Sequence, residues 1–272
     1  MAENIVELLT DVADAIREKK GSTEKINAQA FAEEIKNLPS GGDEGGLNIG
    51  GEVFDETIWA MTNIKEIRFK DGVKNISESL KNFTNLESVY ISSTVTNIAL
   101  SAMSENIKLA KIVVSPDNQA YDSRDNCNAY IVTSSGLLAG GCMNTIVPIG
   151  VKEIGYGAFQ KCKSLTNINL PEGITNIGAY AFYGCDGLTK VEFPSTLKSL
   201  QVYSFGACSH IKLYDFRKHT TIPTLGSSAA FAYISTENKI VVPDALYDDW
   251  VAATNWSALS DNIVKSSEYT EI

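Results

Sequence analysis

The sequence predicts a repeat solenoid, an elongated domain whose coils of about 23 residues stack and each add one strand to a parallel β-sheet. Two observations support this prediction. Three segments beginning at Val151, Ile174 and Leu197 align without gaps at a period of 23 residues. The later part of each segment alternates apolar and polar residues with period two, as a short strand does.

Six columns of apolar residues or cysteines run through the three aligned segments. The most informative are a phenylalanine column and a cysteine column: Phe159, Phe182, Phe205 and Cys162, Cys185, Cys208. We expect the phenylalanines to stack inside the solenoid and the thiols to point inward as small apolar groups. The spacing of the cysteines is the repeat period and not that of metal ligands, so no metal or cofactor site is expected there.

Weaker copies of the strand pattern precede these segments at 63–69, 85–91 and 108–114. The longer gap that follows predicts an irregular coil with a β-hairpin insertion at 115–148. Pairing 127–133 with 136–142 would place Cys127 opposite Cys142, so a disulfide and two reduced, buried thiols both stay open. The segment 122–126 is better explained by hydrogen-bonded turns than by a calcium loop, because it lacks the glycine and terminal glutamate of an EF-hand.

The repeat ITNIGAYAFYGCDGLTKVEFPST resembles the BspA-like leucine-rich repeat family. The resemblance extends over about residues 60–265 and includes the insertion at 120–148 and the segment 240–264. It implies a leucine-rich repeat fold and a role in extracellular adhesion or host interaction in bacteria. Similar repeats also occur in phage-encoded tail proteins.

The chain divides into four predicted parts. Residues 1–38 carry apolar residues at helical spacing and predict a small helical segment for attachment or homo-oligomerisation. Residues 39–47 form a glycine-rich linker, 48–239 the solenoid and 240–272 a C-terminal cap. The text LLTDVADAIREKKGSTEKINAQAFAEEI also resembles the N-terminal segment of tail-associated phage proteins.

Composition narrows the range of partners. The formal net charge of −10 disfavours nucleic acid, which requires a basic surface. No run of apolar residues is long enough to cross a bilayer, so membrane insertion is not expected, and Glu3 and Glu7 do not fit a signal peptide. No common catalytic motif occurs, and we expect His210 and His219 to be structural or solvated.

Strand alternation predicts which side chains face outward and could bind a partner. Two rows of residues leave the core: Glu66, Ser88, Lys111, Asn167, Lys190, Leu213 and Arg68, Tyr90, Val113, Asn169, Glu192, Asp215. Within these rows we predict a partner-binding set: Arg68, Tyr90, Val113, Lys111, Asn169, Lys190, Glu192. Tyrosine and arginine are favoured at binding hot spots, so Tyr90 beside Arg68 is the best anchor.

These observations favour a non-enzymatic surface-recognition protein that binds a protein or glycan on a cell surface. A phage or prophage tail-associated protein, located on the virion, is the first hypothesis, and a bacterial cell-surface adhesin is the second. A carbohydrate-active enzyme is the third, and it would require two carboxylates in a cleft.

Overall fold

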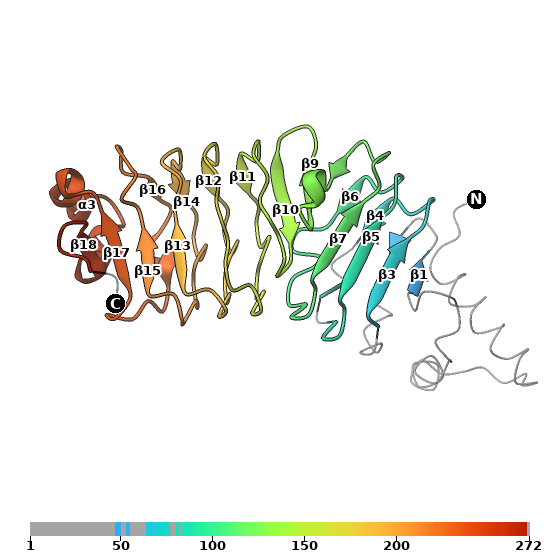
Figure 1. The fold of residues 1–272 in the computed structure, drawn as a ribbon, viewed down its shortest axis with the longest axis horizontal. Coiled ribbons are helices and arrows are strands. Elements are labelled where there is room, and N and C mark those ends of the chain that lie inside the picture. The colour runs from blue at the N-terminus through green and yellow to red at the C-terminus, as the bar shows by residue number, and fades with distance from the viewer. Residues whose placement is uncertain (1–46, 50–52, 55–63, 77–79, 82, 271–272) are drawn as a thin grey trace, which may run out of the picture.

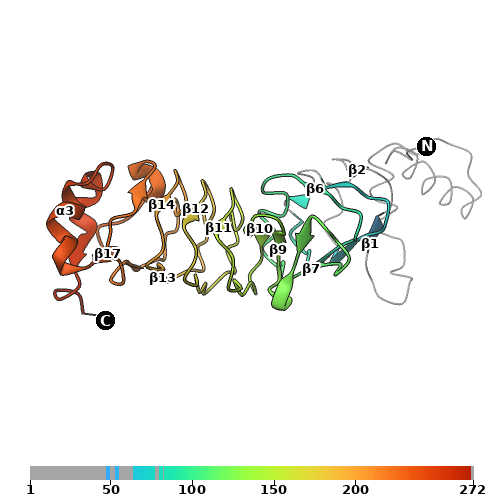
Figure 2. The ribbon, with the colours of Figure 1, turned by 90° about the horizontal axis from the view of Figure 1, so that it is seen from above.

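The computed structural model describes residues 47–49, 53–54, 64–76, 80–81 and 83–270, with the backbone alone at 47–49 and 53–54. Successive coils stack along one axis into a rod, with β1 (Leu47–Ile49) near one end and α3 (Tyr247–Ala252) at the other (Figures 1 and 2). The predicted helical segment 1–38 lies outside these residues. So does the predicted linker 39–47, apart from Leu47, which begins β1.

One wall of the rod, here called the front wall, begins as a four-stranded parallel sheet in the order β1-β3-β5-β7. Its strands after β1 are β3 (Glu66–Phe69), β5 (Ser88–Ile91) and β7 (Lys111–Val114). The register aligns Ile67, Val89 and Ile112, and all three side chains are buried. The alternation of apolar and polar residues therefore sets the inner and outer faces as predicted.

The front wall resumes as a second parallel sheet in the order β13-β15-β17-β18. Its strands are β13 (Lys190–Glu192), β15 (Leu213–Asp215), β17 (Lys239–Val242) and β18 (Ile263–Lys265). The predicted parallel sheet is present but interrupted, because residues 164–170 form no strand between its two halves.

The insertion explains this break. It contains β8 (Tyr121–Asp122), the 3₁₀ helix η3 (Arg124–Asn126), β9 (Ala129–Val132) and β10 (Leu137–Gly141). The Val114 amide donates to Ser123 Oγ at 2.9 Å, and the Ile146 amide donates to the Cys127 carbonyl at 3.0 Å. Residues 123–127 therefore lie between β7 and the next coil, where a further front strand would pair.

The predicted hairpin is confirmed, because β9 and β10 pair antiparallel with Val132 opposite Leu137. An irregularity between Leu138 and Gly140 shifts the register by one residue before the cysteines are reached. Cys127 and Cys142 are both buried and unpaired by disulfide. Of the two alternatives left open by the sequence, the structure therefore has the reduced thiols.

Apart from the hairpin, the opposite wall consists of two-residue strands. β2 (Val53–Phe54), β4 (Asn75–Ile76) and β6 (Asn97–Ile98) form one sheet. A larger sheet joins the hairpin to β11 (Glu153–Ile154), β12 (Asn176–Ile177), β14 (Ser199–Leu200) and β16 (Thr224–Leu225). One buried aliphatic residue from each coil lines this wall: Leu138, Ile154, Ile177, Leu200, Leu225.

The phenylalanine column is confirmed. Phe159 stacks on Phe182 with centroids 5.0 Å apart, and Phe182 stacks on Phe205 at 4.9 Å. Phe231 extends the stack at 6.1 Å from within η4 (Ser228–Phe231). The cysteine column lies beside it, fully inside the core, and burial raises the pKa of Cys162 to about 12.

The far end of the solenoid is covered by η5 (Asp244–Leu246), α3 and η6 (Ser257–Asn262). Trp250 and Trp256 are fully buried and contact Phe216 at centroid distances of 5.3 and 5.5 Å. The Trp256 indole donates to the Pro223 carbonyl at 2.8 Å. The segment predicted as a cap thus contributes two buried tryptophans that cover the end of the core. It also contains most of β17 and all of β18.

Candidate functional site: the outer face of the front wall

The candidate site is the outer face of β3, β5 and β7, and its centre is Tyr90. Parallel pairing in register places Arg68, Tyr90 and Val113 side by side on three successive strands. The same register aligns Glu66, Ser88 and Lys111 in a parallel row. Because the two rows are separated by one buried residue in each strand, all six side chains lie on the outer surface.

Tyr90 contacts a cation on each side. The Arg68 guanidinium lies 3.7 Å from the centre of the Tyr90 ring. Lys111 Nζ lies 5.2 Å from the same ring and donates to the Tyr90 hydroxyl at 3.0 Å. Cation–π contacts of this kind favour one orientation of the Tyr90 ring. The side chain therefore loses less conformational entropy when a partner binds.

The second row holds Arg68 in place. Arg68 Nε donates to Glu66 Oε1 at 2.5 Å, and Ser88 Oγ donates to Glu66 Oε2 at 3.0 Å. Glu66 thus accepts hydrogen bonds from its own strand and from β5. The result is a hydrogen-bonded surface cluster with two positive groups, one negative group and a central aromatic ring, here called the Tyr90 cluster: Glu66, Arg68, Ser88, Tyr90, Lys111.

The structure brings together only part of the predicted binding set. Val113 adjoins Tyr90 in the next strand. Asn169 is exposed but lies on the segment without a strand, beyond the inserted residues 123–127. Lys190 and Glu192 belong to the second half of the front wall, so the set is split between two surfaces.

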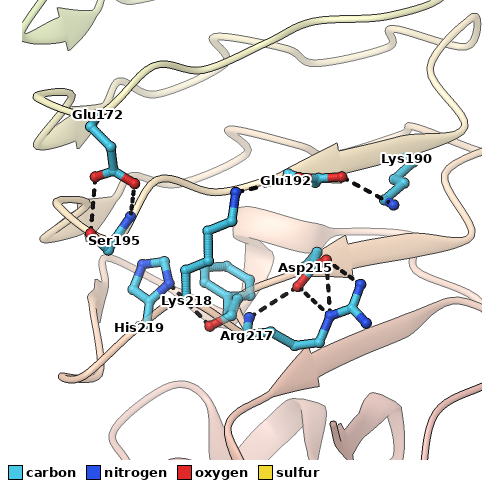
Figure 3. Close-up of polar contacts among 9 residues, drawn as sticks. Glu172, Lys190, Glu192, Ser195, Asp215, Arg217, Lys218 and His219 are labelled. Atoms are coloured by element: carbon cyan, nitrogen blue, oxygen red, sulfur yellow. Dashed lines mark hydrogen bonds and ion pairs between the residues drawn. The ribbon is translucent and has the colours of Figure 1, made fainter.

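The second half of the front wall is occupied by ion pairs (Figure 3). Lys190 Nζ lies 3.1 Å from Glu192 Oε1, and Lys218 Nζ lies 3.6 Å from Glu192 Oε2. Lys218 comes from the turn after β15, and sequence alternation gave no signal for it. Exposed pairs of this kind contribute little to stability, so they leave a polar, solvated surface.

Two residues predicted to face outward are buried, which corrects the row assignment in β15. Leu213 lies in register between Lys190 and Lys239, and the aliphatic stems of such neighbours can cover it. Asp215 is covered by Arg217, whose Nε donates to both carboxylate oxygens at 3.0 Å. Burial acts to raise the pKa of Asp215, but the hydrogen bonds and charge of Arg217 outweigh it and lower the pKa.

The described residues contain no group of three or more histidine, cysteine or acidic side chains placed to hold a metal ion. Asp122, from the segment considered as a calcium loop, is instead bound by Arg124 Nε at 2.7 Å. His210 is exposed and contacts the Asp186 carbonyl, while His219 is buried. No helix within these residues is long and apolar enough to cross a bilayer.

The sequence was compared with models of known protein families. The model of the BspA type leucine-rich repeat region matches residues 18–128 and 141–248 in six copies. The chain belongs to this BspA-type leucine-rich repeat family. The matched ranges omit residues 129–140, which include all of β9 and most of β10. The first range begins at residue 18, inside the segment predicted to be helical, where the structure describes nothing.

Solved structures similar to this BspA-type chain include bacterial leucine-rich repeat proteins. A leucine-rich repeat protein from Eubacterium ventriosum is 16% identical, with 75% of each chain covered and a TM-score of 0.48. A leucine rich cell surface protein from Faecalibacterium prausnitzii is 17% identical, with 71% of this chain and 64% of that chain covered and a TM-score of 0.46. No curated protein matches the chain.

Proposed function

We propose that this BspA-type protein is a non-enzymatic recognition protein that binds a protein on a cell surface through the outer face of β3, β5 and β7. The Tyr90 cluster is the observation that carries the proposal. An aromatic ring fixed between two cations on a rigid sheet is typical of a binding hot spot. Leucine-rich repeats form an interaction fold whose open sheet face commonly binds other proteins.

Charge supports a protein partner. The Tyr90 cluster is locally positive although the chain carries a formal net charge of −10. A partner with an acidic and aromatic patch would complement this cluster, and the remaining acidic surface would disfavour phosphate-rich ligands.

The location of the protein is the finer part of the proposal. The family favours a bacterial cell-surface adhesin. A place on a phage or prophage virion is supported only by the resemblance of residues 1–38 to tail-associated segments. Oligomerisation through residues 1–38 and recognition of a glycan by the front wall stay predictions.

The test is a binding screen of the full chain on an array of purified cell-surface and extracellular-matrix proteins, followed by affinity measurements on the saturable hits. We expect Tyr90→Ala to weaken binding roughly 30-fold, because it removes the ring and leaves Arg68 and Lys111 without their common partner. Tyr90→Phe should be milder, since it removes only the hydroxyl that accepts from Lys111.

The matched control is Glu192→Ala, on the second half of the front wall, which should leave the affinity unchanged. Equal losses in Tyr90→Ala and Glu192→Ala would mean that recognition extends over both halves of the front wall, contrary to the proposal. Full affinity in Tyr90→Ala would remove the Tyr90 cluster from recognition.

A further inference from the structure

The loop that follows β10 exposes two isoleucines on the outer side of the irregular coil. Ile146 is 70% exposed, and Ile149 is 86% exposed, the highest fraction among the large apolar residues that the structure describes. The next two coils carry polar residues at the aligned positions: Asn169, Glu192 and Glu172, Ser195. Two neighbouring isoleucines in the place of polar residues indicate a surface that another molecule covers.

Ile146 belongs to the same outer row as Tyr90. Its two neighbours in sequence are buried, as are the two neighbours of Tyr90. The inserted residues 123–127 bond to β7 on one side, and on the other side the Cys127 carbonyl accepts from the Ile146 amide at 3.0 Å. The order across the front wall is therefore β5, β7, the inserted residues and Ile146. Three steps of strand spacing place Ile146 about 14 Å from Tyr90.

The backbone around Ile146 is held in place. The Cys142 amide donates to Thr145 Oγ1 at 2.8 Å, and the same hydroxyl donates to the Asn128 carbonyl at 2.7 Å. On the other side of Ile146, Pro148 is buried and its carbonyl accepts from the next coil at 3.3 Å. A side chain that protrudes from a fixed backbone loses little conformational entropy when a partner covers it.

The strands of the Tyr90 cluster are too small a surface for a stable protein interface. Three strands of four residues cover roughly 200 Å² of sheet. A stable interface covers about 800 Å² on each partner. A contact centred on Tyr90 must therefore extend beyond these strands. Past β7, the outer surface continues over residues 123–127 to the two isoleucines.

The chemistry of the surface changes along this path. Arg68 and Lys111 outnumber Glu66 at the Tyr90 end, so that end is positive. Ile146 and Ile149 make the other end apolar. A complementary partner has an acidic patch for the first end and an apolar hollow for the second. A folded protein surface can hold these two features at a fixed separation.

We propose that Ile146 and Ile149 are a second anchor for the protein that binds the Tyr90 cluster. They enter an apolar hollow of the partner, about 14 Å from the acidic patch that faces Tyr90. This inference rests on the proposed function and describes the partner as a folded protein with both features. The contact ends at the irregular coil and does not include Glu192.

The experiment is surface plasmon resonance of the full chain and its variants with each array protein that binds saturably. Ile146→Asn and Ile149→Ser introduce residues that the following coils carry at the same positions. Each should weaken binding about tenfold, because it removes an apolar side chain that the partner buries. Ile146→Leu keeps the apolar volume and should bind within roughly threefold of the unmodified chain.

Leu100→Ser is the matched control, because Leu100 is also an exposed aliphatic residue, at 61%, but follows β6 on the opposite wall. It should leave the affinity unchanged. Thermal unfolding of the isoleucine variants should match that of the unmodified chain, since exposed positions contribute little to stability. Lost affinity with unchanged unfolding separates lost contact from lost folding.

Loss of affinity in Tyr90→Ala and in both isoleucine variants would support the second anchor. Loss in Tyr90→Ala with full affinity in Ile146→Asn and Ile149→Ser would overturn it and leave the proposed function standing. Full affinity in Tyr90→Ala, or an array without a saturable hit, would overturn both. An equal loss in Leu100→Ser would also count against the anchor, because any exposed aliphatic residue would then have the same effect.

Discussion

His219 is a buried histidine in the loop that follows β15. Its Nδ1 donates to the Phe216 carbonyl at 3.1 Å, while Nε2 is buried without a hydrogen-bond partner. Its ring meets Phe216 and Trp250 edge-on or nearly so. Burial lowers the pKa of His219, because the charged form would lose its hydration.

This environment predicts a loss of stability in mild acid. The unfolded chain binds a proton at His219 near the ordinary pKa of about 6.5, and the folded chain binds it only at lower pH. The free energy of unfolding should therefore fall as the pH drops through this window. Chemical denaturation between neutral pH and pH 5 would measure the slope.

His219→Phe should flatten that slope, and the exposed His210→Phe should leave it unchanged. The carboxylates of Asp122 and Asp215, whose pKa values lie below the ordinary range, titrate only at more acidic pH and do not confuse the assignment. An unchanged slope in His219→Phe would mean that His219 is neutral or charged alike in both states.

Some individual core residues could be predicted from the sequence, and others could not. Phe159, Phe182 and Phe205 were predictable because each repeats the environment of the last one. Phe231 was not, since 26 residues separate it from Phe205 and the gapless alignment ends before it. The left-handed backbone at Tyr180 and Tyr203 could not be predicted, because periodicity reports burial and carries no information about backbone conformation.

At the scale of elements, the hairpin decides the shape of the front wall. Its pairing could be predicted from alternation and the turn at 134–135, and the irregularity at Ala139 could not. Nothing in the sequence indicated that residues 123–127 would lie beside β7 and end the first sheet. Such a contact depends on tertiary packing of one irregular coil.

The hairpin depends on a glycine. A Cβ added at Gly140 would lie 2.1 Å from Tyr130 Cε1, and Tyr130 is fully buried. We expect Gly140→Ala to lower the free energy of unfolding by about 1–3 kcal/mol, the usual cost of overpacking. Chemical denaturation followed by circular dichroism would measure it.

Gly226→Ala is the control, because its added methyl would meet the flexible end of Gln201 at 3.1 Å and the backbone of Leu200 and Gln201 at 3.4 Å, with no contact as short as the one at Gly140. A Gly140→Ala variant as stable as this control would show that the hairpin can move away from Tyr130.

At the scale of the molecule, the described residues form two hydrophobic clusters that meet at the irregular coil. One runs from Ile67 to Cys142 and the other from Cys127 to Ile263. The repeat fold was predictable as a whole, because stacking of equivalent coils is the only way such short units bury their apolar faces. The sequence did not predict that the front wall divides into two sheets, one with the Tyr90 cluster and the other with the ion pairs of Glu192.

The central claim is that recognition uses the first half of the front wall. Hydroxyl-radical footprinting of the full chain, alone and saturated with the protein ligand found by the array, tests it most directly. The account predicts that oxidation of Tyr90 falls several-fold while that of Tyr233 stays constant. Unchanged oxidation of Tyr90, with protection of the Lys190–Glu192 surface instead, would contradict it.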